Sequence, residues 1–205
     1  LVQDTSWDGY EEVPLQIMKG YWTQIHEIIE QIISSNVDVL FLQVGVGSWA
    51  ASIASYIMIY WENPPMIITV EPLSANCVYE SIKTGKRVFV NNHKNTLMVG
   101  LNCGTVSKIA WEILKNYVRY SLAIPDVYTK RAMRLFAHPI KYDKVIIAGE
   151  SGAGGMAGLI ALLENKRCME KRISTSSTTA FFINTEGDTD SYSYNKIIRM
   201  ADKRC

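Results

Sequence analysis

The sequence predicts an α/β fold in which a mostly parallel sheet is flanked by helices. Short apolar runs, typical of buried strands, alternate along the chain with longer stretches whose apolar residues recur every three or four positions. In addition, two glycine-rich turns each follow an apolar run and precede a helical stretch. This order of elements is typical of parallel strands joined by helices.

The predicted helices and strands extend over the whole chain. The helical pattern is clearest over 13–33, where Pro14 stands in the first turn, a position that suits proline. Further helices are predicted over 48–60, 75–84, 105–120, 127–137 and 152–163. Strands are predicted over 37–44, 66–70, 87–90, 144–148 and 180–183, because these runs are short and mostly apolar.

Composition excludes several classes of protein. A chain of 205 residues with 48% hydrophobic content can bury one sizeable core, which excludes a disordered or fibrous protein. The net charge of +1 gives no overall attraction for nucleic acid or for an anionic membrane. No apolar run reaches the roughly 18 to 20 residues that cross a bilayer. We therefore expect a soluble protein with no nucleic-acid or membrane partner.

The cysteines and histidines indicate neither a metal site nor a disulfide framework. The four cysteines are widely spaced and form no CxxC pair, so reduced thiols and a cytoplasmic location are expected. The three histidines stand far apart, without an acidic or cysteine partner at ligand spacing. No metal ion is expected.

Three turns share one pattern: QVGVGSWA (43–50), AGESGAGG (148–155) and NTEGDTD (184–190) each follow a predicted strand. Ligands in open α/β sheets bind at the carboxyl ends of strands, so the turns are expected to line one crevice. The first turn predicts an anion site, because its small residues expose N–H groups at a helix N-terminus. Taken alone, each turn is explained equally well as a tight connection. The spacing matches neither a nucleotide P-loop nor GxGxxG.

Several segments carry a more specific resemblance. They are QDTSWDGYEEVPLQIMKGY, LQVGVGSWA, VEPLSANCVYES, LMVGLNCG, WEIL, AGESGAGG and NTEGDTD, in this order along the chain. They resemble the carboxyl-terminal half of the diaminopropionate ammonia-lyases, which are pyridoxal-phosphate enzymes of fold type II, the tryptophan synthase β-like fold. The resemblance implies that residues 1–205 are the carboxyl-terminal portion of such an enzyme, mainly its large cofactor-binding domain, with the amino-terminal half absent.

This resemblance implies pyridoxal 5′-phosphate as the cofactor and a small amino acid as the substrate. In the implied reaction, 2,3-diaminopropionate forms an imine with the cofactor, loses its α-proton and expels its β-amino group. The resulting aminoacrylate hydrolyses to pyruvate and ammonia. The cofactor serves as the electron sink, while the protein orients it and manages protons. A homodimer is the assembly that the family implies.

The resemblance also implies cofactor-binding residues. The family's phosphate-binding loop is matched by Gly45, Val46, Gly47, Ser48, Trp49 and Ala50. Backbone amides and the Ser48 hydroxyl would hold the phosphate at a helix N-terminus. Thr185 matches the position beside the pyridine nitrogen, where a neutral hydroxyl leaves that nitrogen largely unprotonated. The family usually has a serine just before this position, where this chain has Asn184.

Three acidic or hydroxyl residues have both a catalytic and a structural interpretation. Asp4 matches an active-site aspartate that takes part in proton transfer or binds an ammonium group. Without the resemblance, Asp4 is better explained as a helix-capping or turn residue. Glu150 and Ser151 would lie near the cofactor ring, and a turn that caps the following helix explains them equally well.

One group that a pyridoxal enzyme needs has no counterpart in this sequence. In this family the lysine that binds the cofactor covalently lies in the amino-terminal half. The family's second active-site aspartate, in a turn of the small domain, is missing from this sequence as well. We therefore expect the isolated chain to be inactive, and activity to need an amino-terminal half, supplied on a separate chain or in a longer product. The alternative is a non-catalytic truncated or split-gene module that acts through binding or assembly.

Overall fold

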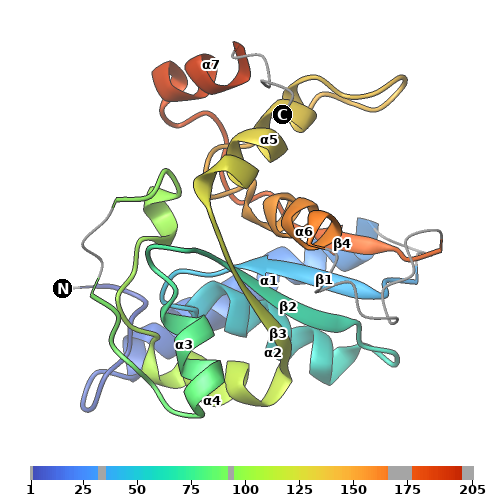
Figure 1. Ribbon diagram of the computed structural model, residues 1–205. Helices are drawn as coiled ribbons and strands as arrows, with labels where there is room; N and C mark the ends of the chain where they lie inside the picture. The colour runs from blue at the N-terminus through green and yellow to red at the C-terminus, as the bar shows by residue number, and fades with distance from the viewer. Residues whose placement is uncertain (1, 32–35, 92–94, 166–176, 200–205) are drawn as a thin grey trace.

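A four-stranded parallel sheet lies at the centre of the computed structural model, which describes residues 2–31, 36–91, 95–165 and 177–199. The strands lie in the order β3, β2, β1, β4, and every neighbouring pair is parallel (Figure 1). Their bounds are Val39–Gln43 for β1, Met66–Pro72 for β2, Val118–Ile124 for β3 and Ala180–Phe182 for β4. The predicted α/β fold with a mostly parallel sheet is confirmed.

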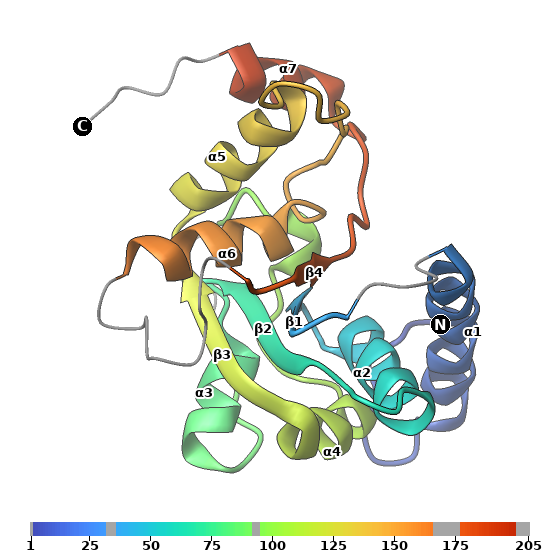
Figure 2. The same ribbon diagram turned by 90° about the vertical axis from the view of Figure 1, so that its right-hand side faces the viewer.

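Helices cover both faces of this sheet (Figures 1 and 2). One face carries α1 (Glu12–Gln31), α2 (Ser48–Tyr60), α3 (Cys77–Thr84) and α4 (Lys108–Tyr117). The other carries α5 (Asp126–Ala137) and α6 (Gly154–Glu164), with α7 (Ser191–Arg199) packed against α5. A 3-10 turn, η1 (Val99–Leu101), precedes α4. Within the described ranges, no helix has the length and apolarity that a membrane span requires.

The central strand β1 is buried on both faces. Leu40 and Leu42 pack with α1, α2 and α4, whereas Val39 and Phe41 pack with α5 and α6. Successive side chains of a strand point to opposite faces, so a strand between two helical layers must be apolar on both. This is why the run VLFLQ shows no polar alternation and why only its last residue, Gln43, is polar.

Two predicted strands are wrong. Residues 87–90 form no ladder: the Val88 N–H donates to the Ser81 hydroxyl oxygen (3.1 Å) and the Val90 N–H to the Gly104 carbonyl (2.8 Å). These isolated hydrogen bonds satisfy the backbone without a neighbouring strand.

The apolar run 144–148 is likewise not a strand. Val145 is 63% exposed, and the Ile146 N–H donates to the Phe136 carbonyl (3.0 Å) at the end of α5. The Ile147 carbonyl accepts from the Asn184 side-chain amide (2.8 Å). Short apolar runs predict burial in a sheet, but this segment pairs with a helix end and a side chain instead.

The remaining elements agree with the predicted ones within a few residues, with two additions. The helix predicted over 105–120 ends at Tyr117, and β3 begins at the next residue. Neither this edge strand nor α7 was predicted from the sequence. Residues 32–33 of the first predicted helix lie outside the described residues.

Gly47 forms the turn between β1 and α2. Its φ of +94° lies in the left-handed region, where residues with a side chain are strained. A Cβ placed there would lie 2.9 Å from Leu114 Cδ1 and 3.3 Å from Ala110 Cβ, both on α4. The missing side chain therefore serves two purposes: it permits the turn, and it lets α2 pack directly against α4.

We expect the change Gly47→Ala to lower the free energy of unfolding by about 2–5 kcal/mol, because backbone strain and overpacking both act. Gly85 is a matched control, since its φ is +72° but a Cβ there would meet nothing within 4 Å. We expect Gly85→Ala to cost only about 1–2 kcal/mol. Urea unfolding of both variants measures the difference, and equal losses would contradict close packing of α4 against this turn.

Glu71, near the end of β2, is a carboxyl group with no exposed surface. Its two oxygens accept the N–H groups of Val78 (2.8 Å) and Tyr79 (2.6 Å) in the first turn of α3. Burial raises the pKa of Glu71 to about 8, although the two N–H donors act in the opposite direction. The folded chain therefore binds this proton more tightly than the unfolded chain, in which the pKa is near its ordinary value of 4.5.

The stabilisation from this proton is complete below about pH 4.5 and is lost as the pH rises through about 8. We expect the free energy of unfolding to fall across this range. The variant Glu71→Gln, which cannot titrate, should flatten the slope even if it lowers the overall stability. Denaturant unfolding at several pH values tests this, with exposed Glu62→Gln as the control. A slope that Glu71→Gln leaves unchanged would assign the pH dependence to another group.

Candidate active site

A cavity of about 420 Å³ opens where β1 and β4 end. It is lined by Asp4, Tyr21, Gln24, Gln43, Val44, Gly45, Val46, Gly47, Ser48, Trp49, Ala50, Gly100, Leu101, Cys103 and Thr185. The structure thus brings together the predicted loop 45–50, the predicted Asp4 and the predicted Thr185, which are far apart in sequence. Since β1 and β4 are parallel neighbours, the segments that follow them leave the sheet at the same edge.

The loop after β1 presents backbone donors to this cavity. Gly47 is the N-cap of α2, and the first bond of that helix runs from the Ala51 N–H to the Gly47 carbonyl (2.8 Å). The N–H groups of Ser48, Trp49 and Ala50 therefore precede the intrahelical ladder, at the positive end of the helix dipole. This geometry favours an anion.

The Ser48 hydroxyl links this loop to the segment that carries Asp4. Its Oγ donates to the backbone carbonyl of Asp4 (2.7 Å), and Ser48 itself is buried. A hydroxyl has one hydrogen, so the contact with a phosphate predicted for Ser48 requires the hydroxyl to turn away from Asp4. The backbone N–H groups need no such change.

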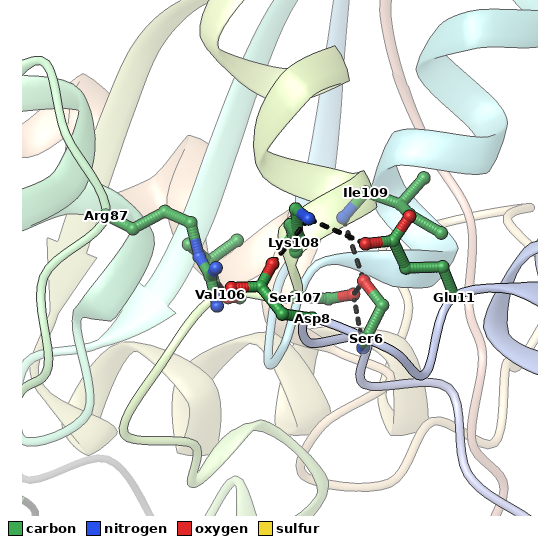
Figure 3. Close-up of polar contacts among 8 residues, drawn as sticks. All are labelled: Ser6, Asp8, Glu11, Arg87, Val106, Ser107, Lys108 and Ile109. Carbon is green, nitrogen blue, oxygen red and sulfur yellow. Dashed lines mark hydrogen bonds and ion pairs between the residues drawn. The ribbon is translucent and has the colours of Figure 1, made fainter.

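Two buried serines hold the Asp4 segment against the start of α4 (Figure 3). The hydroxyl oxygens of Ser6 and Ser107 lie 2.7 Å apart, and the Ser6 N–H donates to Ser107 Oγ (2.9 Å). Ser6 Oγ in turn accepts the Ile109 N–H (2.8 Å), which caps the first turn of α4. The Ser107 N–H donates to the Val46 carbonyl (2.8 Å), so the same contacts reach the cavity loop.

An ion-pair cluster lies at the surface beside these serines (Figure 3). Lys108 Nζ lies 2.5 Å from Asp8 Oδ1 and 2.6 Å from Glu11 Oε1. The lysine lowers the pKa of Asp8, and the two carboxylates raise the pKa of Lys108. Because these side chains are exposed, salt screens the attraction between them. The buried serines therefore contribute more than the ion pairs to holding the Asp4 segment in place.

The predicted Glu150 and Ser151 are not among the cavity-lining residues. Both are buried, and Ser151 Oγ accepts the N–H of Gly100 (3.1 Å), a residue that does line the cavity. The Glu186 carboxylate accepts the Ser151 N–H (2.6 Å) and the Gly152 N–H (3.2 Å). This second glycine-rich turn therefore lies behind the cavity wall and supports it.

Of the two residues that follow Ile183, only Thr185 lines the cavity. Asn184 makes structural contacts: its side-chain amide donates to the Ile147 carbonyl (2.8 Å), and its Oδ1 accepts the Glu186 N–H (3.2 Å). Asn184, which stands where the family usually has a serine, therefore supports segment 144–148. Thr185 is the residue that faces the cavity.

Several residues that line the cavity were not predicted from the sequence. Tyr21 and Gln24 come from α1, and Gln24 Oε1 accepts the indole N–H of Trp49 (2.7 Å). Burial and the nearby charge of Asp4 raise the pKa of Tyr21, so its phenol stays protonated. Gln43 carries the one signal visible in the sequence, a polar side chain at the end of an apolar strand.

The lining of the cavity contains one charged side chain among the described residues. Asp4 is the one lining residue with a carboxylate, and no lysine or arginine is among the described residues that line it. Burial raises the pKa of the Cys103 thiol, which makes it a poor nucleophile at neutral pH. No cluster of three or more potential metal ligands occurs in the part of the chain that the structure describes.

Comparison with known proteins agrees with this geometry. The chain is 36% identical over 204 residues to diaminopropionate ammonia-lyase of Escherichia coli K12, with 97% of this chain covered. It is 38% identical over 208 residues to the enzyme of Salmonella typhimurium, with the same coverage. The chain spans about half the length of these curated relatives, 51% and 52%.

A solved structure of the E. coli diaminopropionate ammonia lyase, in complex with an aminoacrylate-PLP azomethine reaction intermediate, superimposes with a TM-score of 0.88. It is 35% identical in sequence, and the match covers 97% of this chain and 52% of that chain. The sheet and its flanking helices are therefore those of a fold type II enzyme. The model for pyridoxal-phosphate dependent enzymes matches residues 8–179, so the chain belongs to the family of pyridoxal-phosphate dependent enzymes.

Proposed function

We propose that this chain is the cofactor-binding portion of a pyridoxal-phosphate-dependent ammonia-lyase that converts 2,3-diaminopropionate to pyruvate and ammonia. One observation carries the proposal: a single cavity brings together a helix N-terminus with exposed N–H groups, the Asp4 segment and the Thr185 hydroxyl. The family membership and the relatives at 36–38% identity support it.

The residues of the cavity fit pyridoxal phosphate. A volume of about 420 Å³ is in the range of small-molecule sites. The phosphate would be held by the N–H groups of Ser48, Trp49 and Ala50 and by the dipole of α2, without a cationic side chain from the described residues. Thr185 would donate to the pyridine nitrogen. When bound, the cofactor supplies an electron sink for the substrate's α-carbon.

The carboxylate of Asp4 suits a substrate with two amino groups. As the one carboxylate of the cavity, it attracts an ammonium group and can exchange a proton with it. The hydrogen bond from Ser48 and the buried serine pair beside it hold the Asp4 backbone in place. Asp4 is thus held by contacts that do not depend on its own side chain, which leaves the carboxylate available to substrate.

We also propose that the reactive lysine comes from an amino-terminal half, because the described residues that line the cavity include none. The full-length protein, with both halves and added pyridoxal phosphate, is expected to release pyruvate from 2,3-diaminopropionate in a lactate dehydrogenase assay. The chain 1–205 alone should release pyruvate no faster than free pyridoxal phosphate does, since orientation and the lysine are both absent.

Borohydride reduction provides the control for this prediction. Weak, scattered labelling of surface lysines by the cofactor is expected in the lone chain. A single labelled lysine, together with rapid pyruvate formation by the lone chain, would contradict a requirement for another segment. A full-length protein that binds the cofactor but does not act on the substrate would favour a non-catalytic binding module.

A substitution tests the role of Asp4. In the full-length protein, Asp4→Asn is expected to lower kcat/KM for 2,3-diaminopropionate by roughly 100- to 10,000-fold, because the amide can neither accept a proton nor attract an ammonium group. Cofactor absorbance should be unchanged. Asp8→Asn is the matched control, since Asp8 lies in the same segment but faces solvent beside Lys108. Equal activity of the two variants would exclude a catalytic role for Asp4.

A further inference from the structure

Gln43 is a buried polar residue at the edge of the cavity. It ends β1, is 3% exposed, and is the one polar side chain in that strand. It lies between the loop of residues 45–50, called the cradle loop below, and the segment after β4. The family resemblance assigned it no role.

Two hydrogen bonds determine which way the Gln43 amide faces. Its Nε2 lies 2.8 Å from the Ile183 carbonyl oxygen and 2.8 Å from Thr185 Oγ1. A carbonyl oxygen only accepts, so the atom facing it must be the NH₂ group and cannot be the amide oxygen. Both hydrogens of that group are then used, one for Ile183 and one for Thr185.

The hydrogen bond from Gln43 determines how the Thr185 hydroxyl can act. Toward Gln43 its hydroxyl oxygen is an acceptor, so its own hydrogen is left for a different partner. Thr185 lines the cavity, and its hydroxyl donates to no other group among the described residues. The hydrogen is therefore available to whatever occupies the cavity.

Packing alone does not explain a glutamine at this position. Gln43 Oε1 is buried and has no hydrogen-bond partner in the described part of the chain, and it lies against Gly155 in the first turn of α6. An unpartnered buried acceptor is unfavourable. A methionine would fill similar space without this penalty, so the useful part of the side chain is its NH₂ group.

We propose that Gln43 is a positioning residue that makes the Thr185 hydroxyl a hydrogen-bond donor to the unprotonated ring nitrogen of the cofactor. The inference rests on the proposed function, because it requires pyridoxal phosphate in this cavity. Gln43 acts through Thr185, whose hydroxyl oxygen accepts one hydrogen of the Gln43 NH₂ group. It prevents Thr185 from donating to its own neighbour and so leaves the hydrogen for the ligand.

The variant Gln43→Glu reverses this arrangement. An ionised carboxylate only accepts, and a protonated carboxyl group would give its single hydrogen to the Ile183 carbonyl. In both cases the Thr185 hydroxyl would donate to residue 43 and present a lone pair to the ring. In the full-length protein loaded with cofactor labelled with ¹⁵N at the ring nitrogen, we expect the NMR signal to move toward that of a protonated nitrogen. Exposed Gln16→Glu, on α1, is the control and should leave the signal unchanged.

A second variant covers the case in which Gln43→Glu fails to fold. We expect Gln43→Met to weaken pyridoxal phosphate binding roughly 3- to 10-fold, as for the loss of one oriented hydrogen bond. Binding of the 1-deaza analogue, which has C–H in place of the ring nitrogen, should be unaffected. In a Thr185→Val background, Gln43→Met should cause no further loss, because the two residues act as one unit.

The outcomes separate this inference from the proposed function. Absence of pyridoxal phosphate binding by the unaltered full-length protein would overturn both. If the cofactor binds but Gln43→Met weakens the cofactor and its 1-deaza analogue equally, Gln43 has only a structural role and the inference is overturned alone. An unchanged ¹⁵N signal in a folded Gln43→Glu variant would overturn it in the same way.

Discussion

β1 runs parallel to β4, and the two strands end side by side at one edge of the sheet. Every part of the candidate site depends on this pairing. The cradle loop continues β1, Thr185 follows β4, and Gln43 connects the two by donating to Ile183 and to Thr185. An antiparallel pair would have placed one of these segments at the opposite edge, and no common cavity would have formed.

A second constraint comes from the amino-terminal segment, which has little regular structure before α1. Buried serine hydroxyls hold it in place: Ser6 and Ser107 bond to each other, and Ser6 also accepts an N–H of the first turn of α4. Hydrogen bonds of this kind are directional, so they determine the position of the neighbouring Asp4 backbone more strictly than apolar contact would. Ser48 then connects that backbone to the cradle loop.

The wrongly predicted strand 144–148 and the missed strand β3 show what the spacing of apolar residues along the chain cannot decide. The run 144–148 has the composition of a buried strand, yet its side chains are largely exposed and its backbone pairs with the end of α5 and with Asn184. β3 shows the opposite case: it lies at the edge of the sheet, follows α4 without a turn, and is half exposed, so no local signal separated it from the helix. Strand pairing is decided by distant segments, which a local pattern does not contain.

For the site, the sequence by itself determined the loop of residues 45–50. A glycine-rich turn between an apolar strand and a helix needs a left-handed residue and leaves N–H groups exposed, because both properties are local to the backbone of residues 45–50. The family match likewise selected Asp4 and Thr185 from their local motifs. Only the tertiary structure decided that Glu150 and Ser151 lie behind the wall, that Ser48 donates to Asp4, and that Gln43 donates to Thr185. Each of these contacts joins residues more than 40 positions apart, so it depends on how the strands pair and the helices pack, which no short motif contains.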